Sequence, residues 1–183
     1  ILKKKNVSVE VYLAGNQKDD SILLDKAALR LFGLVWSGKG QIKLVENMPL
    51  DLQTLWNYEL PGEAMVQGAG RVSGSLKELI IDNELLGNAK GILSGTVNDI
   101  INGIHWDLKV NAPQLNLQKL HKKIPELNAS ATIEVSGTPQ NLVLSGKLNT
   151  ETKQLGDWQT DFAIERTSEN WHINNLRSTR KEL

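Results

Sequence analysis

Cysteine is absent from this 183-residue chain, and so is an excess of charge of either sign. Without cysteine there are no disulfide bonds and no thiolate metal sites, and cysteine usage gives no indication of an oxidising or a reducing compartment. Lysine plus arginine number 21, as do aspartate plus glutamate, so the formal net charge is zero. Proteins whose main partner is a nucleic acid carry a basic excess that neutralises phosphates, so the balance argues against nucleic acid.

Long apolar runs are missing as well. The chain contains neither a secretory leader nor the run of about 18 apolar residues that a membrane-spanning helix needs. It begins at Ile1 rather than at methionine, and we interpret residues 1–183 as a single segment of a larger protein. At this length a chain buries a substantial apolar surface when it folds, so we expect an ordered structure.

The residue patterns of metal sites and of nucleophilic catalysis are also absent. His105, His121 and His172 stand 16 and 51 residues apart, without the carboxylate or cysteine spacing of a zinc or iron site. No Gly-x-Ser-x-Gly segment occurs, and Ser73 and Ser136 lie in Ser-Gly pairs typical of turns. We therefore predict no catalytic residue, no metal and no cofactor.

The chain contains two Gly-x-Gly segments, a pattern that also occurs in phosphate-binding loops. They lie at residues 38–40 and 68–70, and neither is followed by a helix pattern with a basic residue that would complete a phosphate site. We interpret both as turns or β-bulges.

The dominant pattern in the chain is the alternation of apolar and polar residues over short runs, separated by Gly, Asn, Asp and Pro. In the first run Val7, Val9, Val11 and Leu13 alternate with polar neighbours, and Gly15 with Asn16 is interpreted as the turn that ends it. The same alternation recurs within residues 104–110, 131–135, 142–148, 158–164 and 171–173. We predict about ten strands that share one apolar face.

Three segments depart from this alternation. Residues 50–58 and 115–123 place leucines at mixed spacing and precede Pro61 and Pro125, so we interpret both as short helical turns. Residues 26–32 fit either a helix or a buried strand.

The chain also resembles itself. Residues 50–55 (LDLQTL) correspond to residues 115–120 (LNLQKL), and residues 72–75 (VSGS) correspond to residues 135–138 (VSGT). The matched blocks occur in the same order, which predicts an internal repeat covering approximately residues 45–97 and 110–165. A repeat of this kind buries its apolar face by stacking on its neighbours, so an elongated β structure is expected.

The order of these blocks, an aliphatic-Asp/Asn-Leu turn, a proline, an alternating strand, Ser-Gly-Ser/Thr and Leu-x-Leu, resembles the repeats of the TamB family within the AsmA-like group. The resemblance covers residues 112–149 and, more loosely, 48–96. It implies a long β-groove in the bacterial periplasm, anchored in the inner membrane by a segment absent here, that conducts phospholipid acyl chains toward the outer membrane. It also implies a TamA-like outer-membrane barrel as partner and a link to the assembly of autotransporters and other client outer-membrane proteins.

We accordingly expect an all-β fold: an elongated, curved and open β-groove with one or two short helical turns. A closed β-sandwich is the alternative, because its inward residues would show the same alternation. The candidate residues that line the groove are Val7, Val9, Val11, Ile104, Trp106, Leu108, Ala131, Ile133, Val135, Leu142, Leu144 and Leu148.

Three functions are compatible with these expectations. The first is a non-enzymatic groove that shields phospholipid acyl chains, and the second is an envelope-spanning scaffold that presents strand edges to client proteins without conducting lipid. The third is a carbohydrate-binding or carbohydrate-cleaving β-domain. The five tryptophans suit an interface between apolar and wet surroundings, which fits a groove rim as well as a core edge, and in the third function they would stack on sugars: Trp36, Trp56, Trp106, Trp158 and Trp171.

Overall fold

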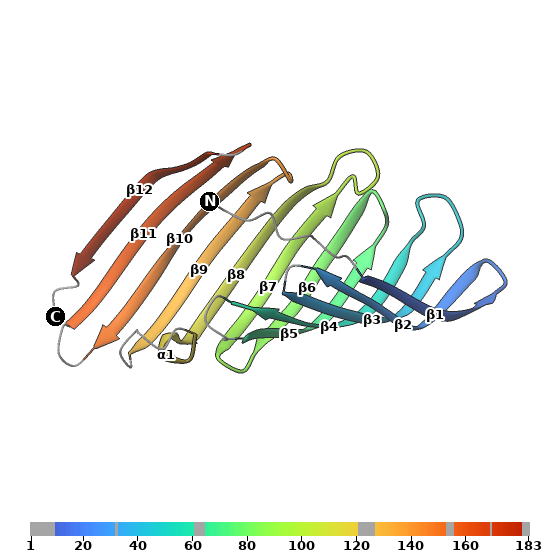
Figure 1. The fold of residues 1–183 in the computed structure, drawn as a ribbon, viewed down its shortest axis with the longest axis horizontal. Helices are drawn as coiled ribbons and strands as arrows, with labels where there is room; N and C mark the ends of the chain where they lie inside the picture. Colours follow the sequence, from blue (N-terminus) through green and yellow to red (C-terminus); the bar gives the residue numbers. More distant parts are fainter. Residues whose placement is uncertain are drawn as a thin grey trace.

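The computed structural model of the protein describes residues 10–31, 33–60, 65–120, 127–152, 156–168 and 170–180. Within them the chain forms twelve strands and one helical turn (Figure 1). These are β1 (Glu10–Lys18), β2 (Ser21–Leu31), β3 (Leu34–Lys43), β4 (Leu50–Glu59), β5 (Met65–Gly74), β6 (Glu78–Leu86), β7 (Ala89–Asn98), β8 (His105–Asn116), α1 (Leu117–Leu120), β9 (Asn128–Gly137), β10 (Asn141–Thr152), β11 (Gly156–Thr167) and β12 (Asn170–Arg180).

All twelve strands belong to one antiparallel sheet, and their order in space is their order in the sequence. Each strand pairs with the strands before and after it, so β1 and β12 each have one edge that is not paired within the described residues. The expected all-β, open sheet is confirmed. The β-sandwich alternative is wrong, because the described strands form a single unclosed sheet and no second sheet packs against it.

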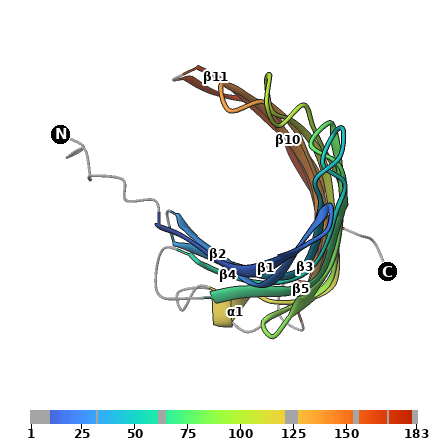
Figure 2. The same cartoon turned by 90° about the vertical axis from the view of Figure 1, so that its right-hand side faces the viewer.

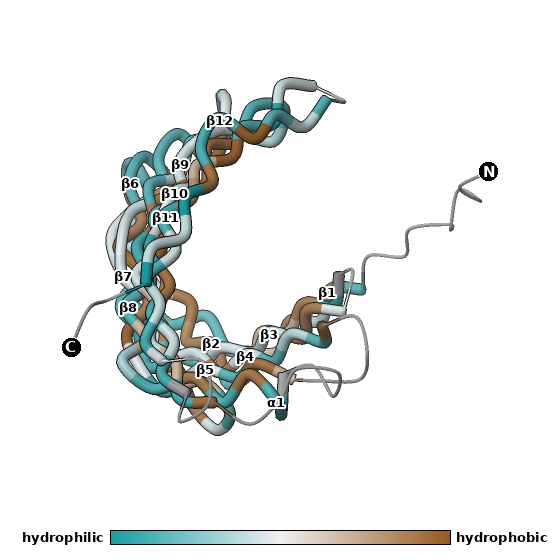
Figure 3. The backbone as a smooth tube through the Cα atoms, turned by 90° about the vertical axis from the view of Figure 1, so that its left-hand side faces the viewer, coloured by the Kyte–Doolittle hydropathy of each residue, from teal (hydrophilic) through white to brown (hydrophobic). Residues whose placement is uncertain are grey.

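The sheet is strongly curved. Along its long axis it has a C-shaped outline (Figure 2), and the hydrophobic stretches of the backbone gather toward the inside of the C (Figure 3). The bend gives the sheet a concave face and a convex face. The side chains of each strand alternate between these two faces. In β4, for example, Leu52 and Thr54 are buried on the concave face, whereas Asp51, Gln53 and Leu55 are exposed on the convex face.

Glycines make this curvature possible. Residues directly opposite each other in an antiparallel pair share a face, and by this register every glycine in the described strands lies on the concave face. Curvature crowds the concave side, and a Cβ at Gly40 would collide with the backbone carbonyl of Asp51. Glycine is therefore the residue that allows neighbouring backbones to approach at these positions.

The Gly-x-Gly segments are consequently not turns. Residues 38–40 lie inside β3 and residues 68–70 lie inside β5. A bulge does occur beside the first segment, but it lies in the neighbouring strand β2. Gly38 and Gly40 pair with Ala27 and Leu24, the two residues that flank this bulge.

The turn expected at Gly15 and Asn16 is also wrong. β1 continues through both residues to Lys18, with a bulge between Ala14 and Gly15, and the two-residue turn lies at Asp19 and Asp20. Asp19 has φ of 52°, which aspartate adopts more readily than most residues. Glycine is required at position 15 for another reason, because a Cβ there would collide with the backbone carbonyl of Leu23.

The helical predictions are correct only in part. Residues 50–58 form strand β4, whose backbone pairs with β3 and β5 on both sides, so sheet pairing overrides the mixed leucine spacing. Residues 26–31 belong to β2. The second segment does contain one helical turn, α1, in which the Asn116 side chain accepts a hydrogen bond from the Lys119 amide at 3.0 Å, as a helix-capping residue does. Phe32, Pro61 and Pro125 lie outside the described residues.

The blocks of the internal repeat differ in how they fold. Residues 72–75 and 135–138 form equivalent hairpins, in which Gly74 pairs with Leu79 and Gly137 pairs with Leu142, each glycine at positive φ. The other block does not correspond, because residues 50–55 are a strand whereas residues 115–120 end β8 and form α1. The repeat as a whole stays a prediction.

In the part of the chain that the structure describes, no helix has the length and hydropathy to cross a membrane.

Candidate functional site

The concave face carries an apolar row that crosses the whole sheet. Twelve residues, one from each strand, are directly paired from β1 to β12, and all of them are glycine, leucine, isoleucine or valine. We call this set the apolar row: Gly15, Leu24, Gly40, Leu52, Val72, Ile81, Gly95, Leu108, Val135, Leu144, Ile164 and Ile173. Its path is perpendicular to the strands, so it runs along the axis of the groove.

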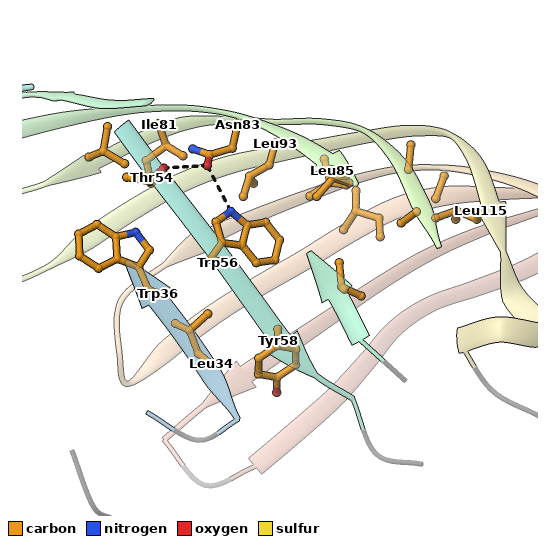
Figure 4. Close-up of a pocket in the computed structure, with 17 residues that line it drawn as sticks. Leu34, Trp36, Thr54, Trp56, Tyr58, Ile81, Asn83, Leu85, Leu93 and Leu115 are labelled. Carbon is orange, nitrogen blue, oxygen red and sulfur yellow. Dashed lines mark hydrogen bonds between the residues drawn. The ribbon is translucent and has the colours of Figure 1, made fainter. Parts of the chain in front are cut away.

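The central part of the concave face encloses a groove of about 590 Å³ between β3 and β9 (Figure 4). Of the 17 residues that line it, all are aliphatic or aromatic except Thr54 and Asn83. The buried cluster of Leu85, Ala89 and Ala112 belongs to this lining, and a second buried cluster, of Leu24, Ala27 and Leu52, packs against Trp36 beside the groove. The lining is thus almost entirely hydrocarbon.

The two polar residues of the groove are hydrogen-bonded to each other. The Thr54 hydroxyl donates to the Asn83 Oδ1 at 3.1 Å, and the Trp56 indole N–H donates to the same oxygen at 3.2 Å. The Asn83 amide donates in turn to the backbone carbonyl of Arg71 at 3.4 Å. Gly70 lies between Thr54 and Asn83 in the sheet and leaves room for this contact. No buried polar side-chain atom of the described residues lacks a partner, so the groove presents little unmet hydrogen bonding to an occupant.

An aromatic pair stands at the β3–β4 side of the groove. Trp36 and Trp56 are directly opposite each other, and Figure 4 shows both beside Leu34 and Tyr58. A Cβ at Gly68 would collide with the Trp56 ring, which means that the ring lies flat over that glycine. Covering a strand glycine with an aromatic ring is a recognised way to stabilise a sheet, and it also fixes the position of the ring.

The structure places most of the predicted lining residues together. Nine of them share the concave face through direct pairing: Val11, Trp106, Leu108, Ala131, Ile133, Val135, Leu142, Leu144 and Leu148. Ile104 precedes β8 and is half-buried, whereas Val7 and Val9 lie outside the described residues. Contact of these side chains with lipid stays a prediction.

The β3–β6 part of the groove was not predicted from the sequence. Trp36, Trp56, Tyr58 and Leu85 line it but were not proposed. The signal was present, because Leu50, Leu52, Trp56 and Tyr58 alternate with Asp51, Gln53, Asn57 and Glu59 over the segment that was interpreted as a helical turn.

Exposure distinguishes this face from an ordinary core. Among the described residues no large side chain is fully buried, although the chain has twelve strands. Toward the two ends of the sheet the concave residues are open to solvent, with Leu13 of β1 66% exposed and Ile173 of β12 67% exposed. The apolar face is therefore most accessible toward the two ends of the sheet and packs more closely between them, where Leu24 and Leu52 are buried.

The convex face holds nearly all the charged side chains of the described strands, interspersed with exposed apolar side chains such as Leu55 and Ile80, and it is crossed by ion pairs between neighbouring strands. Arg71 donates two hydrogen bonds to the Asp51 carboxylate, at 2.6 and 2.5 Å. This bidentate contact lowers the pKa of Asp51, chiefly through the hydrogen bond and further through the positive charge of Arg71. Lys109 pairs with Glu134 at 3.0 Å. These pairs are solvent-exposed, so each adds little stability, but they show which face is in water.

The chemistry that sequence analysis searched for lies away from the groove. His105 and His172 are exposed on the convex face, and His121 lies outside the described residues. The described residues contain no cluster of three or more His, Cys, Asp or Glu side chains that would hold a metal ion.

Comparisons with protein families, with curated proteins and with solved structures find no match to this chain. The function is therefore inferred from the geometry of the groove and from the pattern of the residues.

Proposed function

We propose that this chain is a non-enzymatic groove segment that shields phospholipid acyl chains during passage between the inner and outer membranes of a bacterial envelope. The observation that carries the proposal is the apolar row, which runs unbroken across the twelve described strands on a face that no second sheet covers and is exposed at both ends of the sheet. Each methylene removed from water contributes about 0.8 kcal/mol, so an alkyl chain along this row is strongly favoured over one in water.

The dimensions of the sheet suit a chain-like occupant. Strands lie about 4.8 Å apart, so twelve of them extend roughly 50 Å along the groove axis. The groove is open along one side, as the C-shaped outline in Figure 2 indicates. A lipid on this face buries its acyl chain against the sheet while its headgroup remains in water, which avoids the cost of desolvating a charged group.

The location and the partners of the protein follow from the resemblance of residues 112–149 to TamB-type repeats. On that basis we propose a periplasmic location, a parent protein anchored in the inner membrane, and a TamA-like outer-membrane barrel as its partner. Involvement in autotransporter assembly is part of the same proposal.

Site-specific photocrosslinking tests lipid binding directly. Photoreactive residues at Ile133 and Leu144 sit on the concave face, and matched probes at the adjacent positions Glu134 and Val143 sit on the convex face. We expect phospholipid to copurify with the chain in native mass spectrometry and to crosslink from the first pair only. Absence of lipid, together with crosslinks from Ile133 and Leu144 to protein alone, would refute the proposal.

A second candidate function is a scaffold that pairs with strands of client outer-membrane proteins. It is favoured by β12, in which all eleven residues are exposed and one edge is unpaired within the described residues. An unpaired edge is a template for strand addition. Crosslinks from a probe at Asn175 in β12 to a client strand, with none to lipid from Ile133, would favour the scaffold over the lipid groove.

A further inference from the structure

Charge is almost excluded from the concave face. Followed through the register, the described strands place only two charged side chains on that face, Arg166 of β11 and Arg180 of β12. The other charged residues of these strands lie on the convex face, as in the pairs Lys109–Glu134 and Lys147–Asp161. Both concave charges are positive, and both lie at the β11–β12 end of the sheet.

Each of these arginines is paired with a tryptophan. Arg166 lies directly opposite Trp171, with its guanidinium carbon 5.8 Å from the centre of the indole ring. Arg180 lies directly opposite Trp158, and its guanidinium extends over Gly156, where an added Cβ would be 3.0 Å from Nε. An indole beside a guanidinium provides a surface that is apolar on one side and cationic on the other.

Both guanidinium groups retain donors. The Arg166 Nε donates to the backbone carbonyl of Ser168 at 3.3 Å, and in the described part of the chain neither Arg166 nor Arg180 forms an ion pair with a carboxylate. A guanidinium has five N–H donors in a planar arrangement that matches the oxygens of a phosphate or a carboxylate. Most of these donors are therefore available to an anion.

The two arginines occupy the two rims of the groove. Arg166 is next to the turn between β11 and β12, and Arg180 is at the opposite end of β12. The concave residues between them are Phe162, Ile164, Ile173 and Leu176, together with the small polar side chains of Thr160 and Ser178. This end of the sheet thus combines an apolar floor with a cation at each rim.

We infer that the β11–β12 end binds an anionic amphiphile, with its alkyl chain on the apolar floor and its phosphate or carboxylate headgroup at Arg166 or Arg180. The inference rests on the proposed function and deepens it, because it specifies the headgroup charge. An anion at a rim forms charge-assisted hydrogen bonds without leaving water completely. In the described strands the remaining concave face carries no charged side chain, so it accepts alkyl chains without regard to the headgroup.

The test compares two ligands that differ only in a phosphate, lauroyl lysophosphatidic acid and the neutral monolauroylglycerol, by isothermal titration calorimetry with the full chain. The test variant is Arg166→Gln with Arg180→Gln. Arg177→Gln is the matched control, since Arg177 lies on the convex face of the same strand, opposite Asp161. We expect the wild type to prefer the phosphate-bearing lipid about tenfold, equivalent to ~1.4 kcal/mol. The double variant should lose this preference and bind the neutral lipid unchanged, and Arg177→Gln should keep the preference.

The outcomes separate the inference from the proposed function. Binding of neither lipid to the wild type would overturn both. Equal binding of the two lipids by the wild type, or a preference that persists in the double variant, would overturn the inference alone. Inorganic phosphate provides another arm: arginine-dependent binding of phosphate as tight as that of the lysolipid would exclude an amphiphile. The double Arg→Lys variant, which keeps the charge, should retain most of the preference.

Discussion

At the scale of single residues, size decides which side chains occupy the crowded part of the concave face. Ala27, Ala89, Ala112, Ala129 and Ala131 are among its most buried residues. Two bulky residues of this face, Trp36 and Trp56, lie over Gly38 and Gly68, where no Cβ competes for the space. A curved sheet brings the side chains on its inner face together, so small residues relieve the crowding that curvature causes.

Gly95→Ala tests this explanation. Gly95 has φ of 146°, and a Cβ there would collide with the backbone carbonyl of Asp107. We expect the substitution to lower the free energy of unfolding by about 1–3 kcal/mol, as measured by urea denaturation. Gly103→Ala is the matched control, because nothing lies within 4 Å of its added Cβ, and it should change stability by less than about 0.5 kcal/mol. Equal effects of the two substitutions would contradict the explanation.

The Asp51–Arg71 pair gives a prediction for the dependence on pH. Because Arg71 lowers the pKa of Asp51, the pair stabilises the fold at pH values above the ordinary carboxyl pKa and loses this effect as the pH falls through the lowered pKa. Arg71→Gln should raise the pKa of Asp51 to its ordinary range, as followed by NMR of the side-chain carboxyl carbon. Lys109→Gln, which breaks the ion pair with Glu134 instead, should leave the pKa of Asp51 low. An unchanged pKa in Arg71→Gln would rule out the bidentate contact.

At the scale of the elements, position in the sheet decides what a strand contributes to stability. β4 is paired on both sides and contains buried Leu52 and Thr54, whereas β12 is paired on one side and all its residues are exposed. An aliphatic side chain on the concave face of β4 therefore contributes more to the stability of the fold than one on the concave face of β12.

Leu52→Ala and Ile173→Ala measure this difference within the apolar row. Leu52 is 7% exposed, so its truncation should destabilise the chain by about 2–4 kcal/mol. Ile173 is 67% exposed, and its truncation should cost less than about 1 kcal/mol. The measurement is urea denaturation of both variants. Similar losses of stability in the two variants would mean that Ile173 is buried in solution, which contradicts its exposure in this structure.

At the scale of the whole molecule, the described strands form no core between two packed layers, and most of their buried apolar residues gather in two small clusters on the concave face. Within the described residues stability is spread over eleven pairings between neighbouring strands, and none of these pairings joins strands distant in sequence. Stability of this kind resembles that of repeat proteins, in which each unit contacts only its neighbours. The apolar face left open by this arrangement is the part of the molecule that an alkyl ligand would cover.

An alkyl ligand should therefore stabilise the whole chain. At a concentration of 100 Kd a ligand that binds only the folded state adds about 2.7 kcal/mol, which for a chain of this size raises Tm by roughly 5–10 °C. Calorimetry with the neutral monolauroylglycerol, which needs no charged residue, should show this increase for the wild type. Val110→Asp, which places a carboxylate in the groove, should abolish the increase, and Asn111→Asp on the convex face should preserve it. An increase that survives in Val110→Asp would place the ligand elsewhere.

The sequence alone was sufficient to predict the class of fold and one face of much of the sheet. Alternation with a period of two residues depends only on strand geometry, so it placed Trp106, Leu108, Ile133 and Leu144 on a common face. It failed in β4, where Leu50, Leu52 and Leu55 suggested a helical turn, because the choice between helix and strand there depends on pairing with β3 and β5.

Tertiary structure decided everything that depends on how the strands lie together. A closed sandwich and an open sheet produce the same alternation, since a side chain is apolar whether it faces a second sheet or an open groove. Register decided the continuity of the apolar row and the position of Arg166 and Arg180 on the inner face, because one residue of slippage would move each side chain to the other side. The sequence by itself determined that the chain forms strands with one apolar face. Only the pairing of those strands determined that the face is concave, open and charged at one end.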